Sequence, residues 1–262
     1  MKGNQKIDQE FYDYCQSLYE DWLNGSSRLD SFAEDFEVGF LPEPYFRLPL
    51  NSAPHEGNCL YVLNNNPGHS LPMQAKHKII STFKGKSFSA VADEMGKYYD
   101  SVKFASGANE KFAAKRNEKI KDFARRGGFN SVMCVETFFL HSKCINKAKF
   151  LNKYVTNNLV QEYKAKLTGF LSGKPVLAIA AIGVNRSIDV ASINANPWLV
   201  YQQQILGVNM NKAEKYDIRQ SKKCKVSAAF FVEGAKYISY MMGANSLPKL
   251  SEDDYRRIFG KK

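Results

Sequence analysis

The sequence predicts an α/β protein: a three-layer α/β/α sandwich in which helices cover a central, mostly parallel sheet of four strands. Three observations support this fold class. Short continuous apolar runs are typical of strands buried on both faces, helical segments separate these runs, and polar residues follow them. The 262 residues, 44% hydrophobic with 18 Phe and 14 Tyr, are enough to bury a large core.

Four segments have the composition of buried strands because apolar residues run through them without alternation. The expected strands are residues 58–64, 130–141, 174–183 and 225–232. Apolar residues at helical spacing predict helices between and around them. The expected helices are 8–24, 29–35, 87–102, 108–124, 153–173, 233–242 and 251–259, and residues 41–51 are expected to be extended between prolines.

The chain shows no internal repeat, low-complexity segment or long linker. We therefore expect a single domain over residues 1–262. Residues 1–40 are expected to form an acidic helical extension that packs on one side of its core.

Charge is distributed unevenly along the chain. The net charge is +11, yet residues 1–60 carry 4 basic and 11 acidic side chains, which leaves 33 basic and 15 acidic side chains in the remaining 202 residues. The excess is concentrated in 111–126, 141–153 and 212–225, where basic residues are interleaved with aromatic and amide side chains. Such stretches favour a nucleic-acid backbone as partner, and a solvated basic surface is the alternative interpretation.

Several function classes are disfavoured by missing motifs. The five cysteines are scattered without CxxC spacing, which indicates reduced thiols in the cytoplasm and predicts no metal site. No apolar run approaches the ~20 residues of a membrane helix. The chain has no Walker loop, GxGxxG or nucleophile elbow. We expect a monomer that acts on DNA without a cofactor.

Polar residues follow the predicted strands, most densely in the stretch YVLNNNPGHS (61–70). Three asparagines there precede Pro67 and Gly68, and asparagine is suited to holding water or a ligand by hydrogen bonds. The next two strands are followed by the segments 141–143 and 185–186. Because ligands of such sheets bind beyond the carboxyl ends of the strands, the three polar ends are expected to converge in one cleft.

The Asn64–Gly68 segment at the end of a buried strand resembles the first motif of the uracil-DNA glycosylase superfamily, in its mismatch-directed, Asn-Pro-Gly-type branch. The lead-in PEPYFRLPLN and the stretch ETFFLHSK resemble bacterial members of this superfamily. Asn64 departs from the usual first glycine. The second family motif has no clean match, and NANPW (194–198) comes closest but follows the third strand early.

The resemblance implies hydrolysis of the N-glycosidic bond of a flipped-out pyrimidine in DNA. It assigns Asn66 to holding the attacking water, and the backbone around Asn64 and Asn65 to receiving charge on the departing base. His141 and Ser142 correspond to the place where the base edge is read or the leaving group stabilised. A histidine hydrogen-bonded at the rim of the sheet is the other interpretation of His141.

The remaining site candidates each have a plain structural alternative. Phe83 either stacks on the flipped base or belongs to the core. His69 lines the cleft or lies in an ordinary loop, and Arg186 binds a phosphate or a surface carboxylate. The DNA-binding set that we expect is Lys115, Arg116, Lys143, Asn185 and Arg186.

Gly68 predicts an open pocket. In the strictly uracil-specific branch a tyrosine follows the proline and blocks any group at carbon 5 of the pyrimidine, whereas glycine has no side chain there. A 5-substituted, modified or mismatched pyrimidine should therefore fit, and either housekeeping repair or restriction of foreign viral DNA is admissible. A non-catalytic nucleic-acid binder on a glycosylase-like fold is the main rival, followed by a nucleotide hydrolase or transferase.

Overall fold

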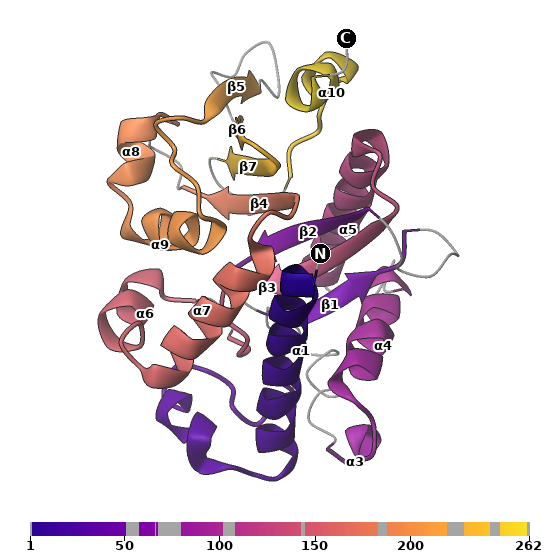
Figure 1. The fold of residues 1–262 in the computed structure, drawn as a ribbon, viewed down its shortest axis with the longest axis vertical. Helices are drawn as coiled ribbons and strands as arrows, with labels where there is room; N and C mark the ends of the chain where they lie inside the picture. Colours follow the sequence, from indigo (N-terminus) through magenta and orange to yellow (C-terminus); the bar gives the residue numbers. More distant parts are fainter. Residues whose placement is uncertain are drawn as a thin grey trace.

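A mixed seven-stranded sheet runs through the molecule in the order β1-β3-β2-β4-β7-β6-β5 (Figure 1). Its strands are β1 (Tyr45–Leu48), β2 (Cys59–Asn64), β3 (Ser131–Glu136), β4 (Val176–Ala181), β5 (Glu214–Ile218), β6 (Ala228–Glu233) and β7 (Lys236–Met241). The computed structural model describes residues 2–50, 58–65, 67, 80–101, 108–142, 145–182, 188–218, 228–241 and 247–260.

Four neighbouring strands of this sheet, β3, β2, β4 and β7, are parallel. The strand β1 joins one side antiparallel to β3, and β6 and β5 extend the other side as antiparallel neighbours. The α/β class is thus confirmed, whereas the predicted four-stranded sheet is wrong in size. The parallel part alone has four strands.

The fourth parallel strand is not the one that the sequence predicted. The segment 225–232 contains most of β6, which is antiparallel, and the predicted helix 233–242 is instead β7. A two-residue turn joins these strands, with Gly234 at a φ of 59°. Glycine at the first central position is typical of a tight hairpin turn, and the closing pair Glu233–Lys236 follows from it.

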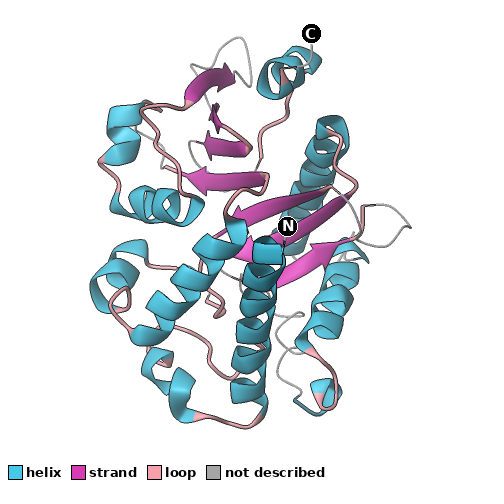
Figure 2. Ribbon diagram, viewed as in Figure 1, coloured by secondary structure: helices cyan, strands magenta, loops and turns pink. Residues whose placement is uncertain are grey.

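Helices cover both faces of the sheet (Figure 2). The helices are α1 (Lys2–Leu23), the 3-10 turn η1 (Ser27–Phe32), α3 (Ile80–Phe83), α4 (Phe88–Ser101), α5 (Ala108–Gly127), α6 (Lys147–Lys153), α7 (Asn158–Leu171), α8 (Val190–Asn194), α9 (Pro197–Leu206) and α10 (Glu252–Phe259). On one face Phe11 of α1 stacks on Phe170 of α7, with ring centroids 4.2 Å apart. Phe170 in turn meets Tyr61 of β2 edge-on. On the other face Phe123 of α5 contacts Tyr237 of β7.

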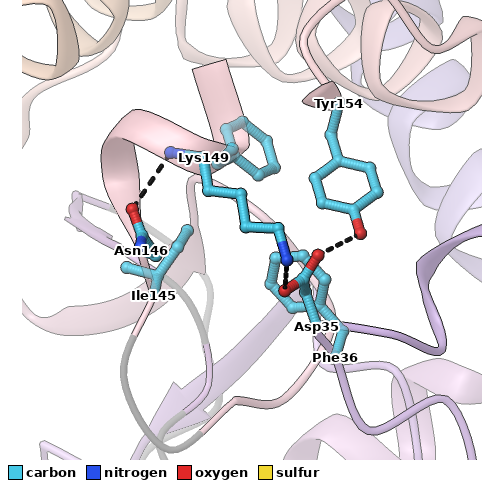
Figure 3. A pocket seen from close by; sticks show the side chains of 7 residues that line it. Asp35, Phe36, Ile145, Asn146, Lys149 and Tyr154 are labelled. Carbon is cyan, nitrogen blue, oxygen red and sulfur yellow. Dashed lines mark hydrogen bonds and ion pairs between the residues drawn. The ribbon is translucent and has the colours of Figure 1, made fainter. Parts of the chain in front are cut away.

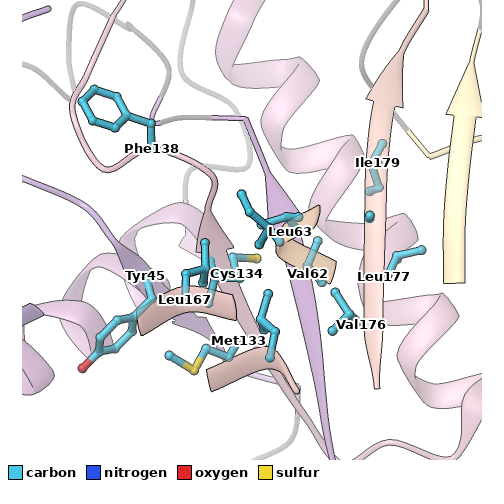
Figure 4. Close-up of a cluster of buried hydrophobic side chains, with 14 of the residues drawn as sticks. Tyr45, Val62, Leu63, Met133, Cys134, Phe138, Leu167, Val176, Leu177 and Ile179 are labelled. Atoms are coloured by element: carbon cyan, nitrogen blue, oxygen red, sulfur yellow. The ribbon is translucent and has the colours of Figure 1, made fainter. Parts of the chain in front are cut away.

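The core explains the apolar runs of the sequence. Val62 and Leu63 of β2, Cys134 of β3 and Leu177 of β4 are all inaccessible to solvent (Figure 4). The strands β2, β3 and β4 therefore bury side chains on both faces, and full burial of one such side chain stabilises the fold by about 1.5–3 kcal/mol.

The acidic N-terminal segment is part of one helical layer. Phe11, Cys15 and Leu18 of α1 are fully buried. Two of its acidic residues pair with lysines later in the chain: Asp8 lies 2.6 Å from the Lys174 ammonium group, and Glu10 lies 2.9 Å from that of Lys166. Some of the excess acidic residues of the N-terminal segment thus pair with excess basic residues of the rest of the chain.

Helix α4 lies against the edge strand β1 at unusually short range. A Cβ atom built on Gly96 would lie 1.5 Å from the backbone oxygen of Arg47. The Arg47 guanidinium ties the two elements together by donating to Asp93 at 3.0 Å. Position 96 thus requires glycine, because α4 lies too close to β1 for any side chain there.

Across the described ranges, no helix is both long and apolar enough to cross a membrane.

Candidate functional site

The carboxyl ends of β2 and β3 lie side by side, with Asn64 opposite Glu136 in the register. The chain leaves β2 to form β3 on one side and later returns to form β4 on the other side of β2. Such a change of direction in strand order is where open α/β sheets bind their ligands. The Asn-Pro-Gly segment begins at this point of the sheet.

A chain of three polar side chains crosses the strand ends on the α5 face. Arg116 of α5 donates to the side-chain oxygen of Asn64, and the Asn64 amide nitrogen donates to Glu136 Oε1 at 2.8 Å. Asn64 and Glu136 are buried, with 5% and 3% of their surfaces exposed. The second carboxyl oxygen of Glu136, Oε2, and Nε of Arg116 are buried without a hydrogen-bond partner among the residues that the structure describes.

Burial raises the pKa of Glu136 to about 7. The hydrogen bond from Asn64 and the charge of Arg116 lower this pKa, and the nearby Glu43 raises it. The desolvation of the carboxylate outweighs these contacts. Near neutral pH a substantial part of the Glu136 population is therefore the neutral acid.

His141 lies in a second buried group of titratable side chains. Its Nε2 atom is 3.3 Å from Glu43 Oε1, and both side chains are 2% exposed. The Tyr99 hydroxyl donates to the carboxylate of Glu43 at 2.8 Å. The ring of Phe40 lies tilted against the imidazole. The structure thus places His141 in the interior beside a carboxylate, and its contact with a base stays a prediction.

Asn65 is bound on the opposite, α9 face of the sheet. Its side-chain oxygen accepts hydrogen bonds from Trp198 Nε1 and Gln202 Nε2, each at 3.2 Å. Gln202 also donates to the Thr137 hydroxyl at 3.3 Å. Two consecutive asparagines therefore attach the end of β2 to helices on the two faces of the sheet.

The NANPW stretch starts helix α9. Asn196 accepts hydrogen bonds from the backbone nitrogens of the first turn, and Pro197 follows at the first helical position. This is a common start of a helix. Trp198 of the stretch contributes the hydrogen bond to Asn65 described above.

The second predicted strand, β3, ends at Glu136, five residues earlier than the sequence predicted. The apolar residues Phe138 and Phe139 extend the pattern of the strand, but they pack in an irregular segment against Phe36 and Tyr163. The polar end of β3 is consequently Glu136 with Thr137, rather than the segment 141–143. A glutamate after the apolar run SVMCV was the available signal for this residue.

Pro67 and Ser142 connect the two segments that follow β2 and β3. Both residues are buried, and the Ser142 backbone nitrogen donates to the Pro67 carbonyl oxygen at 3.3 Å. These two predicted substrate-binding residues are thus brought together. Six other predicted residues lie outside the described residues: Asn66, Gly68, His69, Lys143, Asn185 and Arg186.

Two predicted site residues have other surroundings than expected. Phe83 is buried, with its ring 5.9 Å from that of Trp22, and its carbonyl oxygen accepts a hydrogen bond from the Tyr19 hydroxyl. Of the two interpretations of Phe83, stacking residue and core residue, the structure supports the second: Phe83 packs in the core, from α3 against α1. Arg116 was predicted on a DNA phosphate, but its guanidinium is directed inward to Asn64.

Two lysines of the basic stretch 141–153 are paired with carboxylates within the fold. Lys149 lies 2.9 Å from Glu34 and 2.6 Å from Asp35, and Lys153 also pairs with Glu34. Lys149 and Asp35 line a small pocket of about 50 Å³ together with Tyr154 (Figure 3). With its lysine bound to a carboxylate, this pocket offers little attraction to a phosphate.

Lys115 remains the best test of DNA binding, because it is exposed and adjacent to Arg116 on the half of α5 that reaches β2. We expect Lys115→Glu to weaken DNA binding and to lower the slope of log K against log salt by about 1, since one phosphate contact is lost. Fluorescence anisotropy at several salt concentrations measures both. The control is Lys6→Glu, the same charge change at an exposed position of α1. An equal loss in both variants would show that net charge alone matters.

Within the described parts of the chain, no three His, Cys, Asp or Glu residues form a group that could hold a metal ion. In comparisons with known proteins, no family model, curated protein or solved structure matches this chain.

Proposed function

We propose that this protein is a DNA glycosylase that hydrolyses the N-glycosidic bond of a flipped-out pyrimidine. The observation that supports it most directly is the arrangement of the asparagines at the end of β2. Asn64 is bound to Glu136 and Arg116, and Asn65 to Trp198 and Gln202, so both side chains have structural partners. Asn66 is then the candidate among the three for a contact with water.

The chemistry suits an amide at that position. As the bond between sugar and base breaks, the sugar becomes an oxocarbenium-like cation and the base departs with the electron pair. A water held by Asn66 then attacks the anomeric carbon. The proton that this water releases neutralises the negative charge of the departed base. An orienting hydrogen bond suffices, because the cation is a strong electrophile.

We propose a position for the second family motif from the order of the strands. The motif is expected after the last parallel strand, which is β7, so the sequence Ala244-Asn245-Ser246 occupies that place in the chain order. These residues lie outside the described ones. NANPW, at the start of α9, comes too early, because the three strands β5, β6 and β7 all follow it in the chain.

The substrate that we propose is a 5-substituted or mismatched pyrimidine, in the cytoplasm and either in the cell's own DNA or in foreign DNA. We expect Gly68→Tyr to lower excision of 5-substituted pyrimidines at least about tenfold, because the side chain would fill the space beside carbon 5, and to leave uracil excision within a few-fold. Gly68→Ala is the control, since a methyl group excludes much less. The open pocket would be contradicted if the wild type excised only uracil. It would also be contradicted if Gly68→Tyr lowered the excision of uracil and of 5-substituted pyrimidines equally.

A non-catalytic nucleic-acid binder is the second candidate, and one observation favours it. Asn64, Asn65 and His141 are engaged with other side chains of the fold, as in a site whose polar residues serve structure. The two candidates differ in their product. DNA carrying a panel of modified bases should acquire alkali-sensitive abasic sites if the protein is a glycosylase, and only a mobility shift if it is a binder.

A further inference from the structure

Glu136 is a buried carboxyl group whose two oxygens have different surroundings. Arg116 can only donate hydrogen bonds, so the side-chain oxygen of Asn64 must face it. The amide nitrogen of Asn64 therefore faces Glu136, and Oε1 is the acceptor of its hydrogen bond at 2.8 Å. This order of donors leaves Oε2 as the oxygen that carries the proton when the group is neutral.

The Oε2 atom is the unusual part of this arrangement. It is buried at the carboxyl end of β3, and no partner for it exists among the described residues. A buried polar atom without a hydrogen bond costs about 1–3 kcal/mol, so natural proteins keep few of them. A ligand atom that accepts a hydrogen bond at this strand end would remove the cost.

We propose that Glu136, as the neutral acid, donates a hydrogen bond from Oε2 to a carbonyl oxygen of the departing pyrimidine. This inference rests on the proposed glycosylase function and makes Glu136 a catalytic residue of that reaction. The bond between the anomeric carbon and the base nitrogen breaks, and its electron pair spreads onto the base oxygen that accepts the hydrogen bond. The proton stays on Glu136. The attacking water bonds to the anomeric carbon, and the proton that it releases reaches the base through solvent.

The surroundings support a neutral acid in this place. Burial raises the pKa of Glu136 to about 7, which keeps the donor form populated in neutral solution. A carboxylic acid in an apolar site is a strong donor toward a developing anion. The titratable and charged groups around it are Arg116 of α5, Glu43 before β1, His141 after β3, Tyr99 of α4, Tyr163 of α7 and Cys134 of β3.

The test compares base release by the wild type, Glu136→Gln and Glu136→Ala between pH 6 and 9. The wild-type rate should fall about tenfold per pH unit above the pKa of the acid, because the carboxylate cannot donate. Glutamine keeps the acceptor for Asn64 and puts an N–H donor in place of Oε2, so its rate should vary less than about threefold over this range. Alanine should lower the rate about 100-fold relative to the wild type at pH 6, and this difference should shrink above pH 7, where the wild type loses its donor as well. Thermal unfolding of each variant checks that it is folded.

The same falling limb in the wild type and Glu136→Gln would assign the titration to another group, such as His141, and would overturn the proposal. So would a wild-type rate in Glu136→Ala. A readout independent of turnover is the infrared band of a protonated carboxyl at pH 6, present in the wild type and missing in Glu136→Gln. This band should shift when DNA with a non-hydrolysable 2′-fluoro pyrimidine nucleotide is added. If the wild type releases the base but its infrared band and pH profile match those of Glu136→Gln, only the role of Glu136 is refuted. If the protein releases no base at all, the proposed glycosylase function itself is refuted. An unshifted or missing band overturns the role of Glu136 in either case.

Discussion

Replacement of Asn66 by alanine is expected to lower the rate of base release at least about 100-fold and to leave DNA affinity within a few-fold. A contact that orients the attacking water acts on the transition state and contributes little to the binding of the intact substrate. Single-turnover excision assays and binding isotherms on the same modified duplex measure the two quantities separately.

The matched control is Asn65→Ala, the same truncation one residue earlier. Asn65 accepts two hydrogen bonds from α9, so its loss leaves Trp198 Nε1 without this acceptor and removes one of the two hydrogen bonds that Gln202 Nε2 donates. This variant should be destabilised by about 1–3 kcal/mol. If Asn66→Ala excises bases at the wild-type rate, or loses stability and affinity as Asn65→Ala does, the catalytic assignment of Asn66 is wrong.

The largest effect on stability is expected for Gly96→Ala. The added methyl group would be 1.5 Å from the backbone oxygen of Arg47, and neither the helix α4 nor the strand β1 can yield as a flexible side chain would. Separating them would also disturb the ion pair between Arg47 and Asp93. We expect a loss of about 3 kcal/mol or more in the free energy of unfolding.

Gly169→Ala provides the comparison for this change. Gly169 lies within helix α7, and a Cβ there would make an ordinary contact of 3.4 Å with Ile7. Because alanine is the better helix former, this variant should be neutral or more stable by up to about 1 kcal/mol. Urea denaturation of both variants measures the difference, and equal stabilities would contradict the close packing of α4 on β1.

The buried strands were the most predictable part of the fold. The segments 58–64 and 174–183 contain β2 and β4 nearly to the residue, because an uninterrupted apolar run of this length between polar residues is typical of a buried strand. The same criterion extended β3 too far, since Phe138 and Phe139 are equally apolar but pack outside the ladder. It also missed β7, whose tyrosines and alternation were interpreted as a helix although Gly234 indicates a hairpin.

The site was only partly predictable, because its contacts join distant segments. Asn64 and Asn65 were identified as the end of the first buried strand, and Ser142 and Pro67 were expected near each other. Arg116 and Glu136 meet Asn64 across 52 and 72 residues of sequence, and no local pattern indicates such a contact. Their arrangement depends on the placement of α5 over the sheet.

The charge pattern had the same limitation. The stretch 141–153 is rich in lysine, which favours a phosphate backbone as partner. In the structure Lys149 and Lys153 pair with Glu34 and Asp35, more than 110 residues earlier in the chain. A sum over segments cannot show which charges are paired, so Lys115, exposed on α5, is a better indicator of DNA binding than the stretch 141–153.

The most direct test of the glycosylase proposal is the identification of a released base by mass spectrometry. The wild-type protein is incubated with DNA that contains one 5-substituted pyrimidine, and small molecules are separated from the DNA. The proposal predicts the intact free base in amounts equal to the abasic sites left in the strand, with both missing for Asn66→Ala. Binding of the same DNA without any free base, for uracil and for 5-substituted pyrimidines in single and double strands alike, would contradict it.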